Sequence, residues 1–170
     1  MAISMYSMSV PTFTHMLGSL SHFLDKAVAF SEARKVDPQV LLTDRLAPDM
    51  LAFTRQVQIA CDSAKNGVAR IAGVEAPKFE DKEATFDELK ARIRKTVDFL
   101  NSVPADKLEG TEDRDVTFPL RDKTMTMKGE AYLKHWVMGN FFFHVTTAYA
   151  ILRHNGVELG KQDYLAGGAN

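Results

Sequence analysis

The segment Gly129–His154 constrains the fold more than any other part of the sequence, because it is apolar on nearly every side. Drawn as a helix it leaves almost no polar face, and the residues responsible are Trp136, Phe141, Phe142, Phe143, Tyr149 and Leu152. A helix that is apolar all round is buried all round. Three other helices of one chain rarely enclose a fourth, so we expect a second covering surface. The simplest one is the same aromatic face of a partner in a two-fold homodimer.

Apolar residues recur at spacings of three and four in three earlier segments, which predicts three amphipathic helices. The first helix is expected over Val10–Val36, and the second from Pro48, at a position where proline starts a helix readily, to Gly73. The second helix turns to small residues in its later half, so a neighbouring helix or a ligand can approach its backbone closely.

The third helix is expected to start after Thr85 and Glu88, whose spacing is that of a capping box. Its charged residues, Lys90, Arg92, Arg94 and Lys95, are expected on the solvent side. Alternating residues in the segment 115–128 predict a two-stranded hairpin that packs against the bundle. The expected fold class is therefore all-α: a four-helix bundle with a small β-hairpin before the last helix, as a single domain over residues 1–170.

Composition excludes several classes of function. The 170 residues carry a net charge of −1 with acidic and basic residues interspersed, so a nucleic-acid partner is not expected. No apolar run is long enough to span a bilayer, and the first residues lack the basic and apolar regions of a secretory signal, so we expect a cytoplasmic protein without a membrane role. Cys61 is the single cysteine, which excludes an internal disulfide, and we expect it to be a small buried hydrophobe rather than a reactive thiol.

Two polar residues interrupt the apolar stripe of the segment 129–154. The stripe runs through Leu133, Val137, Asn140, His144, Thr147 and Ile151. His135 lies nine residues before His144, about 900° around a helix, so the two rings face opposite sides and cannot share a metal ion. Asn140 and His144 need partners if they are buried, because an unsatisfied polar group costs about 1 to 3 kcal/mol. They are either a hydrogen-bonded pair in the core or a pair of ligands directed into a pocket.

The motifs "RQVQIACDSAK" and "GNFFFHVTTAYAILRHNG" resemble the DinB/YfiT-like superfamily, and more closely a bacterial branch of it known only as a domain of unknown function. The resemblance covers nearly the whole chain and implies an up-down-down-up bundle that is often dimeric. Metal-binding members of the superfamily use one histidine from the second helix and two, spaced four apart, from the fourth. The last histidine is followed nine residues later by arginine, as His144 is by Arg153.

The same resemblance places Asn140 and Gln58 where the other two metal ligands would be. A divalent metal such as zinc or nickel is therefore implied at His144, Asn140 and Gln58, but amide oxygens are poor ligands for either ion and tight binding is not expected. Asp62 lies one turn after Gln58 and can supply a carboxylate or orient the imidazole. Arg55 lies one turn before Gln58 and can receive an anionic group or form a salt bridge.

Three functions fit these observations. The first is a small-molecule-binding dimer with a degenerate metal site centred on His144, whose pocket is formed by Gln58, Asn140, His144, Asp62 and Arg55. The second, implied by the resemblance, is a metal-assisted, thiol-dependent transferase or isomerase. The third is a structural or stress-related dimer without a ligand. The sequence does not identify a substrate or establish an enzyme.

Overall fold

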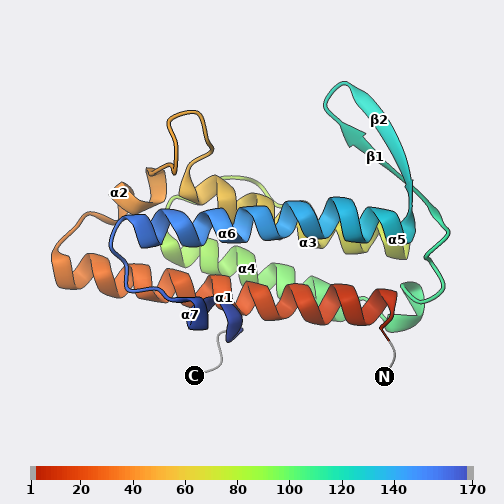
Figure 1. Ribbon diagram of the computed structural model, residues 1–170, viewed down its shortest axis with the longest axis horizontal. Helices are drawn as coiled ribbons and strands as arrows, with labels where there is room; N and C mark the ends of the chain where they lie inside the picture. The colour runs from red at the N-terminus through yellow and green to blue at the C-terminus, as the bar shows by residue number, and fades with distance from the viewer. Residues whose placement is uncertain (1–2, 168–170) are drawn as a thin grey trace.

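The computed structural model describes residues 3–167 and contains a bundle of four long helices (Figure 1). The fourth is continuous through three segments, α5 (Gly129–Ala131), the π-helical turn η2 (Tyr132–Val137) and α6 (Met138–His154), and is called helix four below. It runs in the same direction as α1, whereas α3 and α4 run in the opposite direction. The up-down-down-up bundle with a hairpin before the last helix is therefore confirmed. The first three long helices are α1 (Met5–Arg34), α3 (Phe53–Ala72) and α4 (Phe86–Ser102).

Two helix starts were predicted from local sequence signals, and the structure confirms one of them. Thr85 and Glu88 form the expected capping box, with the Glu88 amide donating to Thr85 Oγ1 at 3.2 Å, and α4 begins immediately after them. The expected start at Pro48 is wrong, because Ala52 has an extended backbone and the helix begins at Phe53, whose amide donates to Asp44 O at 2.8 Å. A capping signal therefore placed a helix start more accurately than a proline did.

The loop between α3 and α4, residues 73–85, returns along the length of the bundle and is called the crossover below (Figure 1). Because of it, α4 starts at the same end of the bundle as α3 and runs parallel to it. The crossover thus lies over α3 and α4 and supplies polar side chains to the space between them.

Helix four packs most extensively on α3, through the small residues expected there. Ala60 and Ala64 are fully buried, and a Cβ atom on Gly67 would lie only 2.4 Å from Val137 Cγ1. Glycine is therefore required at this point of closest approach. Helix four enters the contact through its π-helical turn, a geometry that is frequent at functional sites.

Two small elements cover the ends of helix four. The antiparallel strands β1 (Asp115–Leu120) and β2 (Lys123–Lys128) form the expected hairpin, and Phe118 of β1 packs 5.1 Å from the ring of Trp136. Helix α7 (Lys161–Leu165) packs on α1, where Ser19 Oγ donates to Tyr164 O at 2.8 Å, and the Tyr164 ring lies 6.1 Å from that of Tyr149.

The remaining short helices are α2 (Pro38–Thr43) and the 3-10 turn η1 (Ala105–Lys107). Among the described residues, no helix has the length and apolar character needed to cross a membrane.

Candidate functional site

His144 is buried in the contact between helix four and α3, and its partner is Gln56. Nδ1 of His144 lies 2.6 Å from Oε1 of Gln56, and Nε2 of Gln56 donates to Leu51 O at 2.9 Å. Since the Gln56 nitrogen is used as a donor, its oxygen accepts and Nδ1 of His144 carries the proton. Burial, and secondly the positive charge of Arg55, lower the pKa of His144 to about 4. The imidazole is thus neutral at pH 7, with a lone pair on Nε2.

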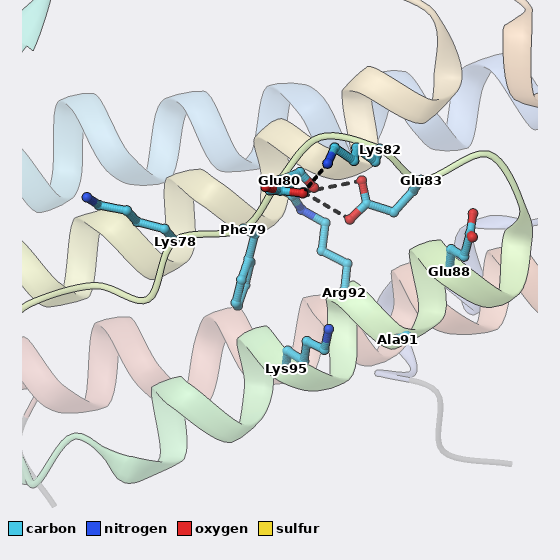
Figure 2. A pocket seen from close by; sticks show the side chains of 9 residues that line it. All are labelled: Lys78, Phe79, Glu80, Lys82, Glu83, Glu88, Ala91, Arg92 and Lys95. Carbon is cyan, nitrogen blue, oxygen red and sulfur yellow. Dashed lines mark hydrogen bonds and ion pairs between the residues drawn. The ribbon is translucent and has the colours of Figure 1, made fainter.

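Arg92 is the centre of a second polar cluster, an ionic network between α3, α4 and the crossover. Its side chain is only 1% exposed and extends from α4 beneath the crossover (Figure 2). Nη2 donates to Asp62 at 2.9 Å, and Nη1 donates to Glu83 at 3.0 Å and pairs with Asp81 at 3.0 Å. The expectation that Arg92 faces solvent is therefore wrong. The crossover folds over this side of α4 and supplies Asp81 and Glu83, two of the three carboxylates that pair with the buried guanidinium.

Arg55, Gln58 and Asp62 belong to this network and not to a pocket around His144. Arg55 donates to Gln58 Oε1 at 2.6 Å and also to Asp81, and Gln58 Nε2 donates to Glu83 at 2.8 Å. Gln56 and Gln58 are two residues apart, about 200° around the helix, so Gln58 points away when Gln56 faces His144. The expected alignment of α3 against His144 is therefore shifted by two residues.

Asn140 is exposed at the edge of helix four, where its side-chain amide donates to Ser63 Oγ at 2.7 Å. The buried positions run through Val137, Phe141 and Val145, so Asn140 falls beside the core and the expectation that it lies within the core is wrong.

A metal site of the kind implied by the superfamily does not fit these positions. The three implied ligands bind different partners: His144 contacts Gln56, Asn140 contacts Ser63, and Gln58 contacts Arg55 and Glu83. Within residues 3–167, no group of three or more histidine, cysteine, aspartate or glutamate side chains has a geometry suited to a metal ion. The donor set is also one that zinc and nickel disfavour.

Cys61 has no reactive character. It is fully buried, and burial raises the pKa of its thiol to about 12, so the nucleophilic thiolate is absent at neutral pH. The expectation of a small buried hydrophobe is confirmed.

Polar groups of α3 and helix four do converge on one hollow of about 240 Å³ beside the π-helical turn. We call it the Arg70 hollow. Its lining residues are Ile59, Asp62, Ser63, Asn66 and Arg70 from α3, and Tyr132, Trp136, Val137 and Asn140 from helix four. Two of the predicted site residues, Asp62 and Asn140, are thus brought together here, in the company of an arginine and aromatic side chains.

A larger hollow of about 380 Å³ lies along the crossover, with Phe79, Glu83 and Arg92 in its lining (Figure 2). Its buried cation, Arg92, is already paired with carboxylates. Its other cationic side chains, Lys78, Lys82 and Lys95, are exposed, so among the described residues that line this hollow no buried cation is free for a ligand.

Sequence reasoning missed Gln56, Arg92 and Arg70. A signal existed for Gln56. It lies three residues after Phe53 and four before Ala60, so it is on the apolar face of α3, whereas Gln58 is not. No local signal marks Arg92 or Arg70, since their surroundings are formed by the crossover and by the π-helical turn.

Comparisons with known proteins agree with this architecture. Residues 5–165 match the model of a family described as a domain of unknown function, DUF1993. The chain is similar to a crystal structure of a DinB family member from Shewanella denitrificans, with a TM-score of 0.89 and 43% sequence identity. That similarity covers 94% of this chain and 90% of the other. Among curated proteins, none matches.

Proposed function

This chain belongs to the DUF1993 family, a DinB-like domain of unknown function, and from that premise we propose that it binds a small polar molecule in the Arg70 hollow, without metal chemistry. The observation that carries the proposal is the convergence of polar side chains from two helices on one hollow beside a π-helical turn. Ligand sites typically combine apolar and aromatic walls with a few placed polar groups, and bundles often form them between helices.

Several polar groups in the hollow retain unused hydrogen-bonding capacity. Ser63 accepts a hydrogen bond from Asn140, so its own hydroxyl proton and the Asn140 carbonyl oxygen are free for a ligand. A transferase or isomerase that depends on a metal at His144 is less well supported, because His144, Asn140 and Gln58 contact separate partners.

Thermal melting across a panel of metabolites tests the proposal. A ligand present at 100 times its dissociation constant stabilises the folded protein by about 2.7 kcal/mol. Asn140→Trp fills the hollow and is expected to abolish the shift. Asn101→Trp places the same side chain at an exposed position of α4 outside the hollow, and is expected to preserve it. A panel without any hit contradicts the proposal and favours a structural role. A shift that persists in Asn140→Trp also contradicts it, because the ligand then binds outside the Arg70 hollow.

We also propose that the chain forms a homodimer through the outer face of helix four. Phe143 supports this proposal, because it is 55% exposed in the middle of that face. Its test is given in the Discussion.

A further inference from the structure

We propose that the Arg70 hollow selects a small monocarboxylate with a flat apolar body, bound through its carboxylate to Arg70 and Tyr132. This inference rests on the proposed function, since it names the class of ligand for the same hollow. It depends on the charges, the free donors and the order of the side chains along the hollow.

The first step concerns charge. Two acidic or basic groups line the hollow, Asp62 and Arg70. Asp62 is neutralised by Arg92 at 2.9 Å and by Lys65 at 3.0 Å. No carboxylate among the described residues forms an ion pair with Arg70, whose side-chain partner is the Tyr132 hydroxyl at 3.0 Å. The hollow therefore presents one uncompensated positive charge, which favours an anionic ligand.

The second step concerns hydrogen-bond donors. Arginine has five N–H groups, and Arg70 uses one on Tyr132, which leaves four for a ligand. Because the Tyr132 oxygen accepts that bond, its own proton remains available to donate. Tyr132 is only 1% exposed and its ring packs 4.8 Å from that of Phe118, so the hydroxyl is held in place. A guanidinium with an adjacent fixed hydroxyl suits the two oxygens of a carboxylate.

The third step concerns order along the hollow. Tyr132, Trp136 and Asn140 are spaced four apart on helix four, so they lie one turn after another along the same side. Trp136 therefore stands between the donor end at Tyr132 and the polar pair of Asn140 and Ser63. Ser63 and Arg70 are seven residues apart on α3, about 10 Å along the helix axis. A ligand with a carboxylate at one end and a flat apolar body against Trp136 matches this order.

The charge balance favours a carboxylate over a phosphate. A single unpaired arginine compensates one negative charge, whereas a phosphate group carries between one and two at pH 7. Inorganic phosphate is therefore the probe for this alternative.

Trp136 provides a specific readout, because it is the only tryptophan of the chain and lines the hollow. We would titrate the full chain with benzoate, with its neutral analogue benzamide and with inorganic phosphate, and follow Trp136 fluorescence. Benzoate is expected to give a saturable change at millimolar concentration or below. Benzamide and phosphate are expected to bind about tenfold more weakly or not at all.

The variants separate this inference from the proposed function. Arg70→Gln is expected to weaken benzoate binding about tenfold, and Tyr132→Phe to weaken it less. Arg94→Gln, which removes an exposed arginine of α4, is expected to change nothing. Far-ultraviolet circular dichroism checks that each variant is folded. If Arg70→Gln is not folded, Arg70→Lys replaces it; this change keeps the charge but loses the paired N–H groups, so it is also expected to weaken benzoate binding.

The carboxylate inference is wrong if benzoate causes no change, if benzamide or phosphate binds as well, or if Arg70→Gln binds benzoate normally. If benzoate does not bind but a neutral ligand does, and Asn140→Trp abolishes the binding of that ligand, this inference is overturned while the proposed function stands. Failure of every compound in the metabolite panel would overturn both.

Discussion

The low pKa of His144 is expected to make the stability of the fold depend on pH. Its pKa is about 4 in the folded chain, against 6.5 when unperturbed. Between these values the unfolded chain binds a proton that the folded chain excludes, so the free energy of unfolding falls as the pH falls. The contribution is complete above pH 6.5 and is lost as the pH approaches 4. From pH 7 to pH 4.5 the loss from this residue is expected to be about 2 kcal/mol.

Urea unfolding of the wild type and of His144→Gln at several pH values between 7 and 4.5 measures this contribution. The variant retains a polar side chain but cannot titrate, so its free energy of unfolding should depend less steeply on pH over this range. Equal slopes for the two proteins would show that the imidazole is not held neutral.

His144 and Arg92 illustrate how far the sequence predicts individual residues. The nine-residue spacing to Arg153 and the interrupted apolar stripe were sufficient to locate the polar position at His144 in the core. They were insufficient to identify its partner, because a choice between Gln56 and Gln58 depends on the rotation of α3. The burial of Arg92 was inaccessible to periodicity, since its carboxylate partners Asp81 and Glu83 lie on an irregular loop.

The close contact of α3 with helix four depends on the absence of a side chain at one position, Gly67. Gly67→Ala places a Cβ 2.4 Å from Val137 Cγ1, so we expect a loss of about 1 to 3 kcal/mol from overpacking. Gly139→Ala is the matched control, because a Cβ there meets no atom within 4 Å. Alanine favours a helix over glycine, so the control should gain about 1 kcal/mol. Chemical denaturation measures both, and a neutral or stabilising Gly67→Ala would show that the helices can separate locally.

The Arg92 network holds the crossover to α3 and α4 through Asp81 and Glu83. Arg92→Met keeps much of the side-chain volume but leaves Glu83 without its cation, and we expect it to destabilise the fold by about 3 kcal/mol. This is the low end of the usual range because Asp62 and Asp81 are 30% and 39% exposed. Arg94→Met, at an exposed position two residues away, should change stability by less than about 0.5 kcal/mol.

Hydrogen exchange locates the effect of Arg92→Met, with faster exchange expected in the crossover and at the start of α4. If exchange changed equally throughout the bundle, the network would stabilise the whole fold and not this element in particular.

At the scale of elements, the sequence predicted the four long helices and the hairpin because each has its own periodicity. The capping box at Thr85 and Glu88 placed the start of α4, and the alternating residues placed both strands. Helix α7 has only five residues, too few for a periodic signal, and its position depends on contacts with α1 such as that of His22 with Asp163 at 3.0 Å. The π-helical turn was not predicted either. A single turn of this kind is too short to change the spacing of apolar residues, which followed that of an ordinary α-helix.

At the scale of the whole molecule, helix four was expected to need a partner chain to cover its apolar side chains. Part of that cover comes from the chain itself. Phe118 of the hairpin covers Trp136, and Tyr164 of α7 packs with Tyr149 and Phe23. Phe141 and Leu152 are fully buried within the bundle. The apolar segment thus required more cover than three helices provide, and two small elements supply much of it.

The outer face of helix four still carries Phe143, and the homodimer proposal depends on this residue. Phe143 is 55% exposed there, and a two-fold interface places the same face of the partner against it. A stable interface buries about 800 Å² on each chain, and a central aromatic residue commonly contributes much of its energy. We therefore expect sedimentation equilibrium to give twice the chain mass of 19.0 kDa for the wild type.

Phe143→Ser is expected to weaken this dimer at least tenfold, as the loss of an aromatic residue at the centre of an interface commonly does. Val40→Ser is the control, because Val40 is similarly exposed, at 53%, but lies on α2. The two variants remove comparable apolar exposure, so a general change in solubility affects both, whereas a specific interface is sensitive to Phe143 alone. The proposal is wrong if the wild type is monomeric at micromolar concentration, or if both variants weaken the dimer equally. Phe143 would then be an ordinary exposed side chain, and helix four would need no cover from a partner.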